Sequence, residues 1–297
     1  MRLVLGSRGS QLALWQAGWV RAALEKLGCE VEIQVIKTSG DRYQRGALSE
    51  IGNKGLFVKE IEEALLAGEI DVAVHSLKDM PVRLPEGLTI AAFPPREEPR
   101  DALVGGRLLE LPEGARVGTG SLRRQAQLLA ARADLKVTAL RGNVDTRLRR
   151  LDAGEFEAVV LAAAGLQRLG LADRIAQLLP EQIMCPAPGQ GALAVETRRE
   201  GEPLEVCSRL DDPETRAAVI AEREVMRELE AGCQTPVGAL GQVVGSHLQL
   251  CAAVASADGS QVVREQLCAP VEEAVEAGRA LARRLLERGA GELLQRP

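Results

Sequence analysis

The chain has 297 residues, a formal net charge of −5 and a charged fraction of 27%. This length allows two or three domains, and the negative charge argues against a general binder of nucleic acid or other polyanions. Aromatic residues make up only 2% of the chain, so its cores must be built from Leu, Val, Ile and Ala. No run of residues has the pattern of a membrane span or a secretion signal, so we expect a cytoplasmic protein.

The first part of the chain has the pattern of an α/β unit. A Gly/Ser turn (GSRGS) separates an apolar strand from an amphipathic helix, and Ser10 is a suitable N-cap for that helix. A long polar stretch at 38–56 has no periodicity, and a loop of this length is usually functional or disordered. In chain order the patterns predict a strand at 2–5, a helix at 11–28, a strand at 30–38, a helix at 58–68 and a strand at 71–75.

A second unit repeats this plan after a proline-rich, charged linker at 93–99. Residues 115–132 again read as strand, Gly/Ser turn and helix. The segment CPAPGQG at 185–191 predicts a second crossing, after which the strand at 191–197 returns to the first lobe. Two crossings indicate a hinge between two lobes that face a cleft. Further elements are predicted as strands at 136–140 and 157–163 and helices at 143–153 and 164–169.

The last part of the chain has an α+β pattern. A helix at about 213–231 precedes three strand-like runs, at 239–244, 247–256 and 261–269, and a long helix begins near residue 270. We therefore predict three domains: residues 1–94 with 191–210, residues 97–187, and residues 212–297.

Arginine recurs where predicted strands meet helices. Ligands of open α/β sheets bind at the carboxyl ends of strands, where helix N-termini favour anions, and a guanidinium adds a fork for carboxylates. Together these features indicate a site for a ligand with several negative groups, although any single arginine is more often a surface charge. The arginines in question are Arg8, Arg123, Arg124, Arg141, Arg147 and Arg168.

The segment VHSLKDMP places Lys78 and Asp79 where an apolar strand stops at Pro81. A carboxylate at a strand end can act as an acid or base, or can stabilise a developing cation. The alternative is a polar turn that proline terminates. We expect His75 to be a strand histidine with a satisfied hydrogen bond.

Six cysteines are widely spaced without a CxxC pair, which argues against a zinc site and a disulfide framework. Cys233 follows a predicted helix, and Gly232, Pro236 and Gly238 indicate an exposed, tight loop around it. A thiol there could be a nucleophile or a covalent anchor, whereas the base rate for cysteine favours a buried structural role. Nucleotide-binding glycine motifs and a serine nucleophile elbow are absent from the sequence.

Eight motifs occur in order along the chain: SRGSQLALWQA, GNKGLFVKEIE, VHSLKDMP, VGTGSLRRQ, LRGNVDTRL, AAAGLQRLG, APGQGALAVE and GCQTPVGA. Together they closely resemble the porphobilinogen deaminase family, also called hydroxymethylbilane synthase, from residue 3 to the last helix. The resemblance implies an α/β fold with two periplasmic-binding-protein-like lobes joined by a hinge. It also implies a C-terminal α+β domain with a three-stranded antiparallel sheet that carries the loop of Cys233.

The implied activity is that of a transferase of tetrapyrrole (porphyrin and heme) biosynthesis. Such enzymes link four porphobilinogen molecules head to tail on a dipyrromethane cofactor, release ammonia at each addition, and then release hydroxymethylbilane by hydrolysis. The cofactor is held by a thioether to a loop cysteine, and Cys233 occupies that position. The resemblance further implies a monomer without a metal, whose product passes to uroporphyrinogen-III synthase.

The resemblance also assigns roles to individual residues. Asp79 matches the catalytic aspartate, and the polar stretch at 38–56 resembles a mobile lid that ends near Lys54 and Phe57. The implied cofactor-binding residues are Cys233, Lys78, Asp79, Ser121, Arg123, Arg124 and Gly165. The implied substrate-binding residues are Arg8, Ser10, Lys54, Phe57, Arg141, Arg147, Arg168 and Gln190.

Two other kinds of protein remain as alternatives. A non-enzymatic bilobal anion-binding protein would share the two lobes and the anion-binding helix starts, but it would need neither Cys233 on a loop nor the Lys78–Asp79 pair. A cysteine-dependent transferase or hydrolase without a bound cofactor is the second alternative. An aldehyde reagent that colours pyrroles distinguishes both from a protein that carries a dipyrromethane.

Overall fold

The computed structural model describes residues 1–39, 58–232 and 235–295. The chain divides into two compact units, Met1–Arg96 with Ala192–Arg216 and Glu97–Gly191 with Ala217–Pro297. The first unit contains the predicted first lobe, and the second contains both the predicted second lobe and the C-terminal region. The finer three-domain boundaries remain a prediction.

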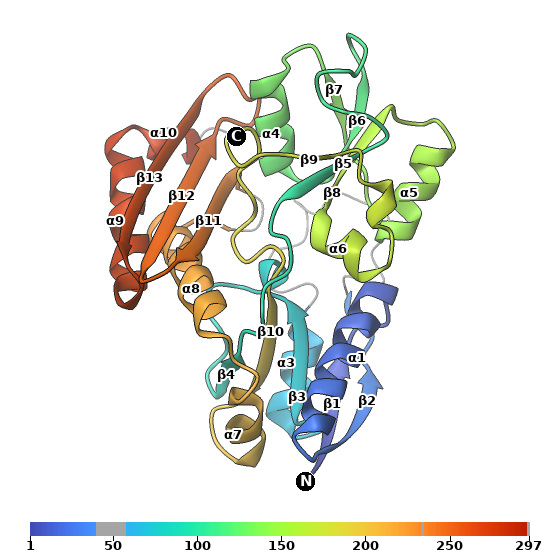
Figure 1. The fold of residues 1–297 in the computed structure, drawn as a ribbon, viewed down its shortest axis with the longest axis vertical. Helices are drawn as coiled ribbons and strands as arrows, with labels where there is room; N and C mark the ends of the chain where they lie inside the picture. The colour runs from blue at the N-terminus through green and yellow to red at the C-terminus, as the bar shows by residue number, and fades with distance from the viewer. Residues whose placement is uncertain (40–57, 233–234, 296–297) are drawn as a thin grey trace. The chain divides into compact units, whose positions relative to one another are not determined.

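A five-stranded sheet with the strand order β2-β1-β3-β10-β4 forms the first unit. β1, β2 and β3 are parallel, whereas β10 is antiparallel to both of its neighbours. The predicted return of the chain to this lobe is therefore confirmed, since β10 comes from after the second crossing (Figure 1). The elements are β1 Arg2–Ser7, α1 Gln11–Lys26, β2 Glu30–Val35, α3 Lys59–Ala67, β3 Val72–Ser76, the 3-10 helix η2 Leu77–Asp79, β4 Leu88–Ala92, β10 Leu193–Arg198 and α7 Glu202–Ser208.

The two faces of this sheet are covered by different helices. On one face Leu3, Leu5, Val72 and Val74 pack with Ala17, Val20 and Leu24 of α1. On the other face the alternate strand residues, such as Ala73, pack with Ile61 and Leu65 of α3. Side chains alternate between the faces along a strand, so His75 and Glu196 lie on the α3 face with Ala73.

The α/β part of the second unit repeats this topology, with the strand order β7-β6-β8-β5-β9. β6 is parallel to β7 and β8, and β5 runs antiparallel to β8 and β9, as β10 does to its neighbours in the first lobe. The elements are β5 Asp101–Val104, β6 Arg116–Gly118, α4 Leu122–Ala131, β7 Lys136–Thr138, α5 Val144–Asp152, β8 Ala158–Ala162, α6 Ala163–Arg168, the 3-10 helix η3 Ala172–Arg174 and β9 Gln177–Leu178.

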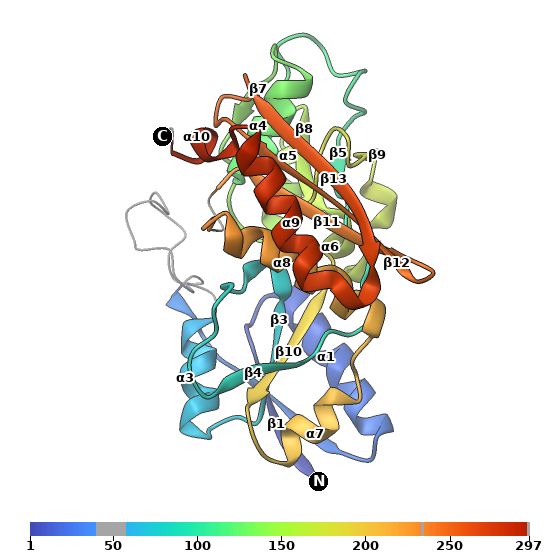
Figure 2. The ribbon, with the colours of Figure 1, turned by 90° about the vertical axis from the view of Figure 1, so that its left-hand side faces the viewer.

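The predicted three-stranded antiparallel sheet is also confirmed, with the order β11-β12-β13. Figure 2 shows α9 lying along one face of this sheet. The predicted long last helix is interrupted, because Gly289 adopts a positive φ of 89° between α9 and α10. The elements are α8 Pro213–Glu228, β11 Val237–Val244, β12 His247–Ala255, β13 Val262–Pro270, the 3-10 helix η4 Val271–Glu273, α9 Ala274–Glu287 and α10 Ala290–Gln295.

One loop assignment from the sequence is wrong. Gly238 lies inside β11 and is buried, rather than in the exposed loop around the cysteine. A Cβ at this position would lie 2.5 Å from the carbonyl oxygen of Cys185. Glycine is therefore required here by the close approach of two backbones, and not by a turn.

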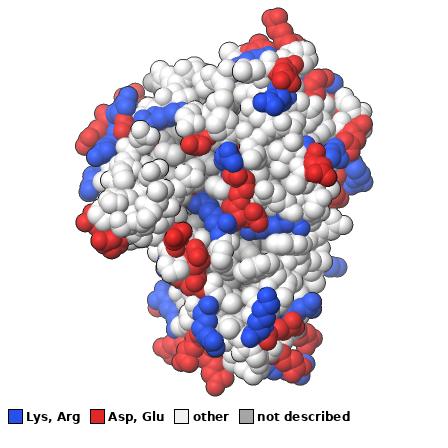
Figure 3. Space-filling model, in the orientation of Figure 1, with Lys and Arg blue, Asp and Glu red and all other residues white. Residues whose placement is uncertain are grey.

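The sequence patterns also failed to predict β4, β5, β9 and α7, which are all short. β5 has four residues, and all of them are buried, so it shows no alternation of polar and apolar residues. Among the described residues, no helix combines the length and apolar character needed to span a membrane. Acidic and basic side chains are interspersed over the face of the molecule in Figure 3, in keeping with the small net charge of −5.

Candidate active site

Arg8 and Ser10 lie in the turn between β1 and α1. The Ser10 hydroxyl accepts a hydrogen bond from the backbone N–H of Ala13 at 3.3 Å, so it caps the helix as the sequence predicts. Both residues are half-buried. They stand at the carboxyl end of β1, the edge of a parallel sheet at which ligands bind.

Lys78 and Asp79 lie in η2, which follows directly from β3, the parallel neighbour of β1. The turn is anchored by buried Leu77 and Met80, and the Met80 N–H donates to the Leu77 carbonyl at 3.0 Å. Asp79 itself is exposed, and Lys78 is half-buried. The first lobe thus holds an accessible carboxylate and a cation at the same sheet edge as Arg8 and Ser10.

In the second lobe, Arg123 and Arg124 are buried at the start of α4, with exposed fractions of 4% and 5%. Ser121 caps this helix, because its hydroxyl accepts from the Arg124 N–H. Arg123 Nη1 donates to the Cys185 carbonyl at 2.6 Å, and Arg124 Nη1 donates to the Val160 carbonyl at 3.0 Å. These bonds fix both guanidinium groups against β8 and the second crossing.

A residue that the sequence patterns did not single out, Asp101, lies between these two arginines. Its Oδ2 atom is 2.8 Å from Arg123 Nη1, and its Oδ1 atom is 2.7 Å from Arg124 Nη2. Gln190 also donates to Asp101 Oδ1 at 3.0 Å, which brings the second crossing into this group. An acidic residue at the start of an apolar strand is the only signal that the sequence carries.

The electrostatics of this group favour an anionic ligand. Burial alone would raise the pKa of Asp101, but the charges of Arg123 and Arg124 and a hydrogen bond from Gln190 hold that pKa well below its usual range. Asp101 is therefore ionised, and the three side chains Asp101, Arg123 and Arg124 together carry one positive charge. A ligand carboxylate would balance that charge.

The other predicted residues of this lobe are spread over the same edge of its sheet. Arg168 is buried in α6, its Nη2 donates to the Gly191 carbonyl at 2.7 Å, and burial lowers the pKa of its guanidinium. Arg141 and Arg147 are half-buried around the start of α5, where Arg147 Nε donates to the Gly142 carbonyl at 2.7 Å. Gly165 is buried in α6.

Three predicted site residues, Lys54, Phe57 and Cys233, lie outside the described residues. The other five cysteines lie within the described residues, and each is a free thiol. Burial raises the pKa of the Cys207 thiol to about 12, and a hydrogen bond with Cys251 together with burial raises that of Cys185. Because the thiolate is the reactive form, Cys185 and Cys207 are poor nucleophiles.

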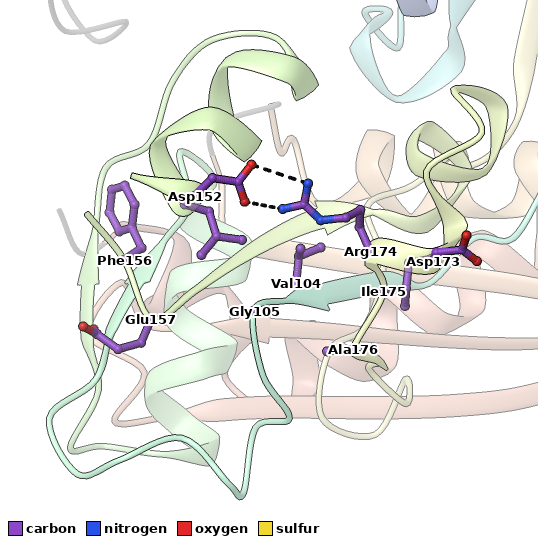
Figure 4. Close-up of a pocket in the computed structure, with 10 residues that line it drawn as sticks. Val104, Gly105, Asp152, Phe156, Glu157, Asp173, Arg174, Ile175 and Ala176 are labelled. Atoms are coloured by element: carbon purple, nitrogen blue, oxygen red, sulfur yellow. Dashed lines mark hydrogen bonds and ion pairs between the residues drawn. The ribbon is translucent and has the colours of Figure 1, made fainter. Parts of the chain in front are cut away.

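A shallow pocket of about 460 Å³ lies elsewhere on the second lobe (Figure 4). It is lined by Val104 at the end of β5 and by Phe156 and Glu157 just before β8, so it is at the opposite end of these strands from Asp101. An ion pair between Arg174 and Asp152 spans it at 2.5 Å. None of the predicted site residues lines this pocket.

Sequence comparisons cover almost the whole chain. A family described as "Porphobilinogen deaminase, dipyromethane cofactor binding domain" matches residues 3–205, and one described as "Porphobilinogen deaminase, C-terminal domain" matches residues 216–287. The porphobilinogen deaminase of Desulforudis audaxviator is 53% identical over 300 residues, which cover 99% of this chain and 97% of that protein. The porphobilinogen deaminase of Geobacter metallireducens is 50% identical over 298 residues, covering 99% and 94% respectively.

Comparisons with solved structures find more distant similarities. A TRAP periplasmic solute binding protein from Desulfovibrio salexigens matches 71% of this chain and 72% of its own, with a TM-score of 0.42 and 11% identity. A periplasmic substrate-binding protein of an ABC transporter from Coxiella burnetii matches 70% of this chain and 91% of its own, with a TM-score of 0.42 and 14% identity.

Proposed function

The chain belongs to the porphobilinogen deaminase family, and we propose that Cys233, Asp79 and the arginines at the edges of the two sheets carry out its reaction. The enzyme is a transferase of tetrapyrrole synthesis that condenses four porphobilinogen molecules and yields hydroxymethylbilane. The observation that supports this assignment best is the match to porphobilinogen deaminases along nearly the full length of both chains.

The residues of the second lobe suit a dipyrromethane, whose acetate and propionate groups are anionic. When bound by a thioether to Cys233, this cofactor supplies the pyrrole chain that porphobilinogen extends. The buried Arg123–Arg124–Asp101 group carries an excess of positive charge that its carboxylates would balance. Ser121 and Gly165 stand at the same sheet edge, and we assign them to the cofactor as well.

The remaining arginines and Ser10 serve the substrate. Arg8 and Ser10 in the first lobe, and Arg141, Arg147 and Arg168 in the second, bind acetate and propionate groups as the chain grows. Burial of Arg168 makes its charge interact more strongly with an anion than an exposed arginine would, because the local dielectric constant is low. Gln190 contributes through Asp101 and Arg124, to which it is hydrogen-bonded.

Asp79 has the chemical role in this proposal. Each addition forms a carbon–carbon bond between two pyrrole units, releases ammonia and removes one proton from the attacking pyrrole. Positive charge develops on the pyrrole rings, and the Asp79 carboxylate stabilises it at the ring nitrogens and accepts or returns a proton there. Its exposure in η2 leaves the side chain accessible to substrate. Lys78 supplies a neighbouring cation for a ligand carboxylate.

The finer parts of the assignment are also proposals. Lys54 and Phe57 cover the substrate from the end of the stretch at 38–56. We infer a cytoplasmic monomer that passes its product to uroporphyrinogen-III synthase. The non-enzymatic anion-binding alternative has less support, since it accounts for the anion-binding helix starts but not for the full-length match to porphobilinogen deaminases.

The intact mass of the purified protein, with and without porphobilinogen, tests this function. We expect an excess equal to two linked pyrrole units, located on Cys233 by peptide mapping, and further increases of one pyrrole each on adding substrate. Cys233→Ser should lack the excess, whereas Cys268→Ser, which removes an exposed thiol of β13, should keep it. An excess mapped to another residue would overturn the anchor. A mass that stays unmodified after incubation with preformed hydroxymethylbilane, without turnover, would favour the anion-binding protein.

A further inference from the structure

Three titratable side chains are buried together between α3 and the first-lobe sheet. They are Glu62 of α3, His75 of β3 and Glu196 of β10, with exposed fractions of 7%, 5% and 0%. His75 Nε2 lies 3.0 Å from Glu196 Oε2, so the ring nitrogen donates to the carboxylate. The expected hydrogen bond of His75 is thus confirmed, but its partner is a buried acid from a strand that is distant in sequence.

The cluster is short of hydrogen-bond donors. Within the described part of the chain, no hydrogen-bond partner is found for Glu62 Oε1 or for Glu196 Oε1, although both atoms are buried. A buried ionised carboxylate without donors is costly, and two of them close enough to influence each other's charge are more so. A proton on one carboxyl relieves this cost, since it removes a negative charge and supplies a donor.

Other charged groups near α3 do not supply that donor. Arg198, two residues further along β10, donates to the Leu65 and Ile70 carbonyls and pairs with Asp71. Glu63, the neighbour of Glu62 on the helix, is 63% exposed and pairs with Lys59 at 3.8 Å. Burial, the charge of Glu196 and that of Glu63 raise the pKa of Glu62 to about 7, while the charge of His75 opposes this rise.

The cluster is close along β3 and β10 to the turn that carries Asp79. Ala194 of β10 pairs with His75, Leu193 pairs with Ser76, and the Leu77 N–H continues the ladder by donating to the Ala192 carbonyl at 3.1 Å. η2, which carries Asp79, begins at Leu77. The side-chain link from His75 to Glu196 therefore joins β3 to β10 at the last residues before the turn.

We propose that Glu196, together with His75 and a protonated Glu62, is a positioning group that holds the end of β3 and so fixes Asp79 for the reaction. This inference rests on the catalytic role proposed above for Asp79. Glu196 and His75 do not touch the substrate; they act by keeping β3 and β10 in register where η2 begins. The proton on Glu62 lets the three side chains stay buried together, because it removes one negative charge and supplies a hydrogen-bond donor.

The stability of the first lobe must then depend on pH. The pKa of Glu62 is raised from 4.5 to about 7, so the folded protein holds a proton that the unfolded chain releases between these values. The stability that this proton provides is fully present below pH 4.5 and is lost as the pH rises through about 7. Glu62→Gln is always neutral, so relative to the wild type it should gain stability as the pH rises.

Two measurements on the holoenzyme test whether Glu62 is protonated. They are thermal unfolding between about pH 4.5 and 8, and infrared difference spectra of wild type against Glu62→Gln. We expect the melting temperature of Glu62→Gln to rise relative to wild type between about pH 4.5 and 7 and the difference to level off above that range, and a protonated-carboxyl band that disappears as the pH passes the pKa. Glu63→Gln, next to it and exposed, should follow the wild type in both measurements. A constant difference in melting temperature, with no band, would overturn the protonated state.

The positioning role is tested by kinetics with porphobilinogen. Glu196→Leu should lower kcat by about tenfold while KM stays within about twofold, because the geometry of the reacting group changes and binding does not. Glu196→Gln keeps an oxygen for His75 and should restore kcat to within about threefold. Unchanged kcat in folded Glu196→Leu would overturn the role. If Glu196→Leu does not fold, His75→Phe, which removes the other partner of the same hydrogen bond, provides the test.

These outcomes separate this inference from the proposed function. A wild-type protein that never turns over porphobilinogen would refute the function, whereas the infrared band and the pH-dependent melting temperature would still report on the cluster. In an active enzyme, the kcat of the Glu196 variants decides the positioning role alone.

Discussion

The two α/β lobes share one strand order, yet each places an aspartate at the same edge of its sheet in an opposite environment. Asp79 follows β3 in η2 and is exposed. Asp101 begins β5 beside the last residue of β8, the equivalent of β3, and is fully buried between Arg123 and Arg124. Topology alone therefore does not decide what an acid at this edge does.

The buried charges of the two lobes differ in sign as well. The first lobe buries two glutamates against one histidine, so the cluster is short of positive charge and retains a proton. The second lobe buries two arginines that both pair with one aspartate, and we propose that this group suits an anionic ligand. Under the proposed function, the same architecture therefore serves the chemical step in the first lobe and the binding of carboxylates in the second.

The largest effect should come from Asp79→Asn. Removal of the charge that stabilises the developing cation should lower kcat by about two to four orders of magnitude. The fold should be preserved, since Asp79 is exposed and substitutions at such positions change stability by about 0.5 kcal/mol or less. Steady-state kinetics and thermal unfolding measure the two quantities separately. Asp173→Asn, an exposed acid of the pocket in Figure 4, is the matched control and should leave kcat unchanged.

Asp101→Asn should lower the stability of the fold far more than Asp79→Asn does. It removes the carboxylate with which both buried guanidinium groups pair, which should cost about 3–5 kcal/mol of unfolding free energy in chemical denaturation. The pKa of Asp101 is held low in the folded protein, so this stabilisation is present at neutral pH and is lost as the pH falls below the usual range for a carboxyl. The difference between variant and wild type should therefore shrink in acid.

The control for Asp101 is an ion pair on the surface of the same lobe. Glu157 pairs with Arg116 at 2.6 Å, but the two side chains are 33% and 48% exposed. Glu157→Gln should cost much less than Asp101→Asn, because solvent screens such exposed pairs. Equal losses for Asp101→Asn and Glu157→Gln would mean that the buried group is not what stabilises the second lobe.

The features of the two lobes that depend on short-range sequence signals were predicted well. Ser10, η2 and the strand–turn–helix units depend on caps, turns and periodicity within a few residues, and these signals are visible in a single chain. Asp101 was missed because its partners Arg124 and Gln190 are 23 and 89 positions away, and β5 shows no alternation. His75 was recognised, but Glu196, 121 positions away, was not. Contacts of this range depend on the strand order, which the periodicity of one segment does not encode.

The smallest of these effects is expected at Arg147, and it tests whether the excess positive charge of the second lobe extends beyond its buried group. Arg147 and Arg149 are two residues apart on α5, and both can be replaced by glutamine at little cost in stability. Arg149 is largely exposed and pairs with Asp145 at 3.7 Å, so it is the matched control. Arg147 is half-buried and oriented by the Gly142 carbonyl.

If Arg147 binds a carboxylate of the growing pyrrole chain, Arg147→Gln loses one charge-assisted hydrogen bond of about 1.5 kcal/mol, which corresponds to roughly a tenfold rise in KM. kcat should change little, since the carboxylate is remote from the bond that forms. Arg149→Gln should leave both constants at their wild-type values. A similar rise in KM for both variants would indicate a diffuse electrostatic attraction, and unchanged constants for both would confine the binding of carboxylates to the buried arginines.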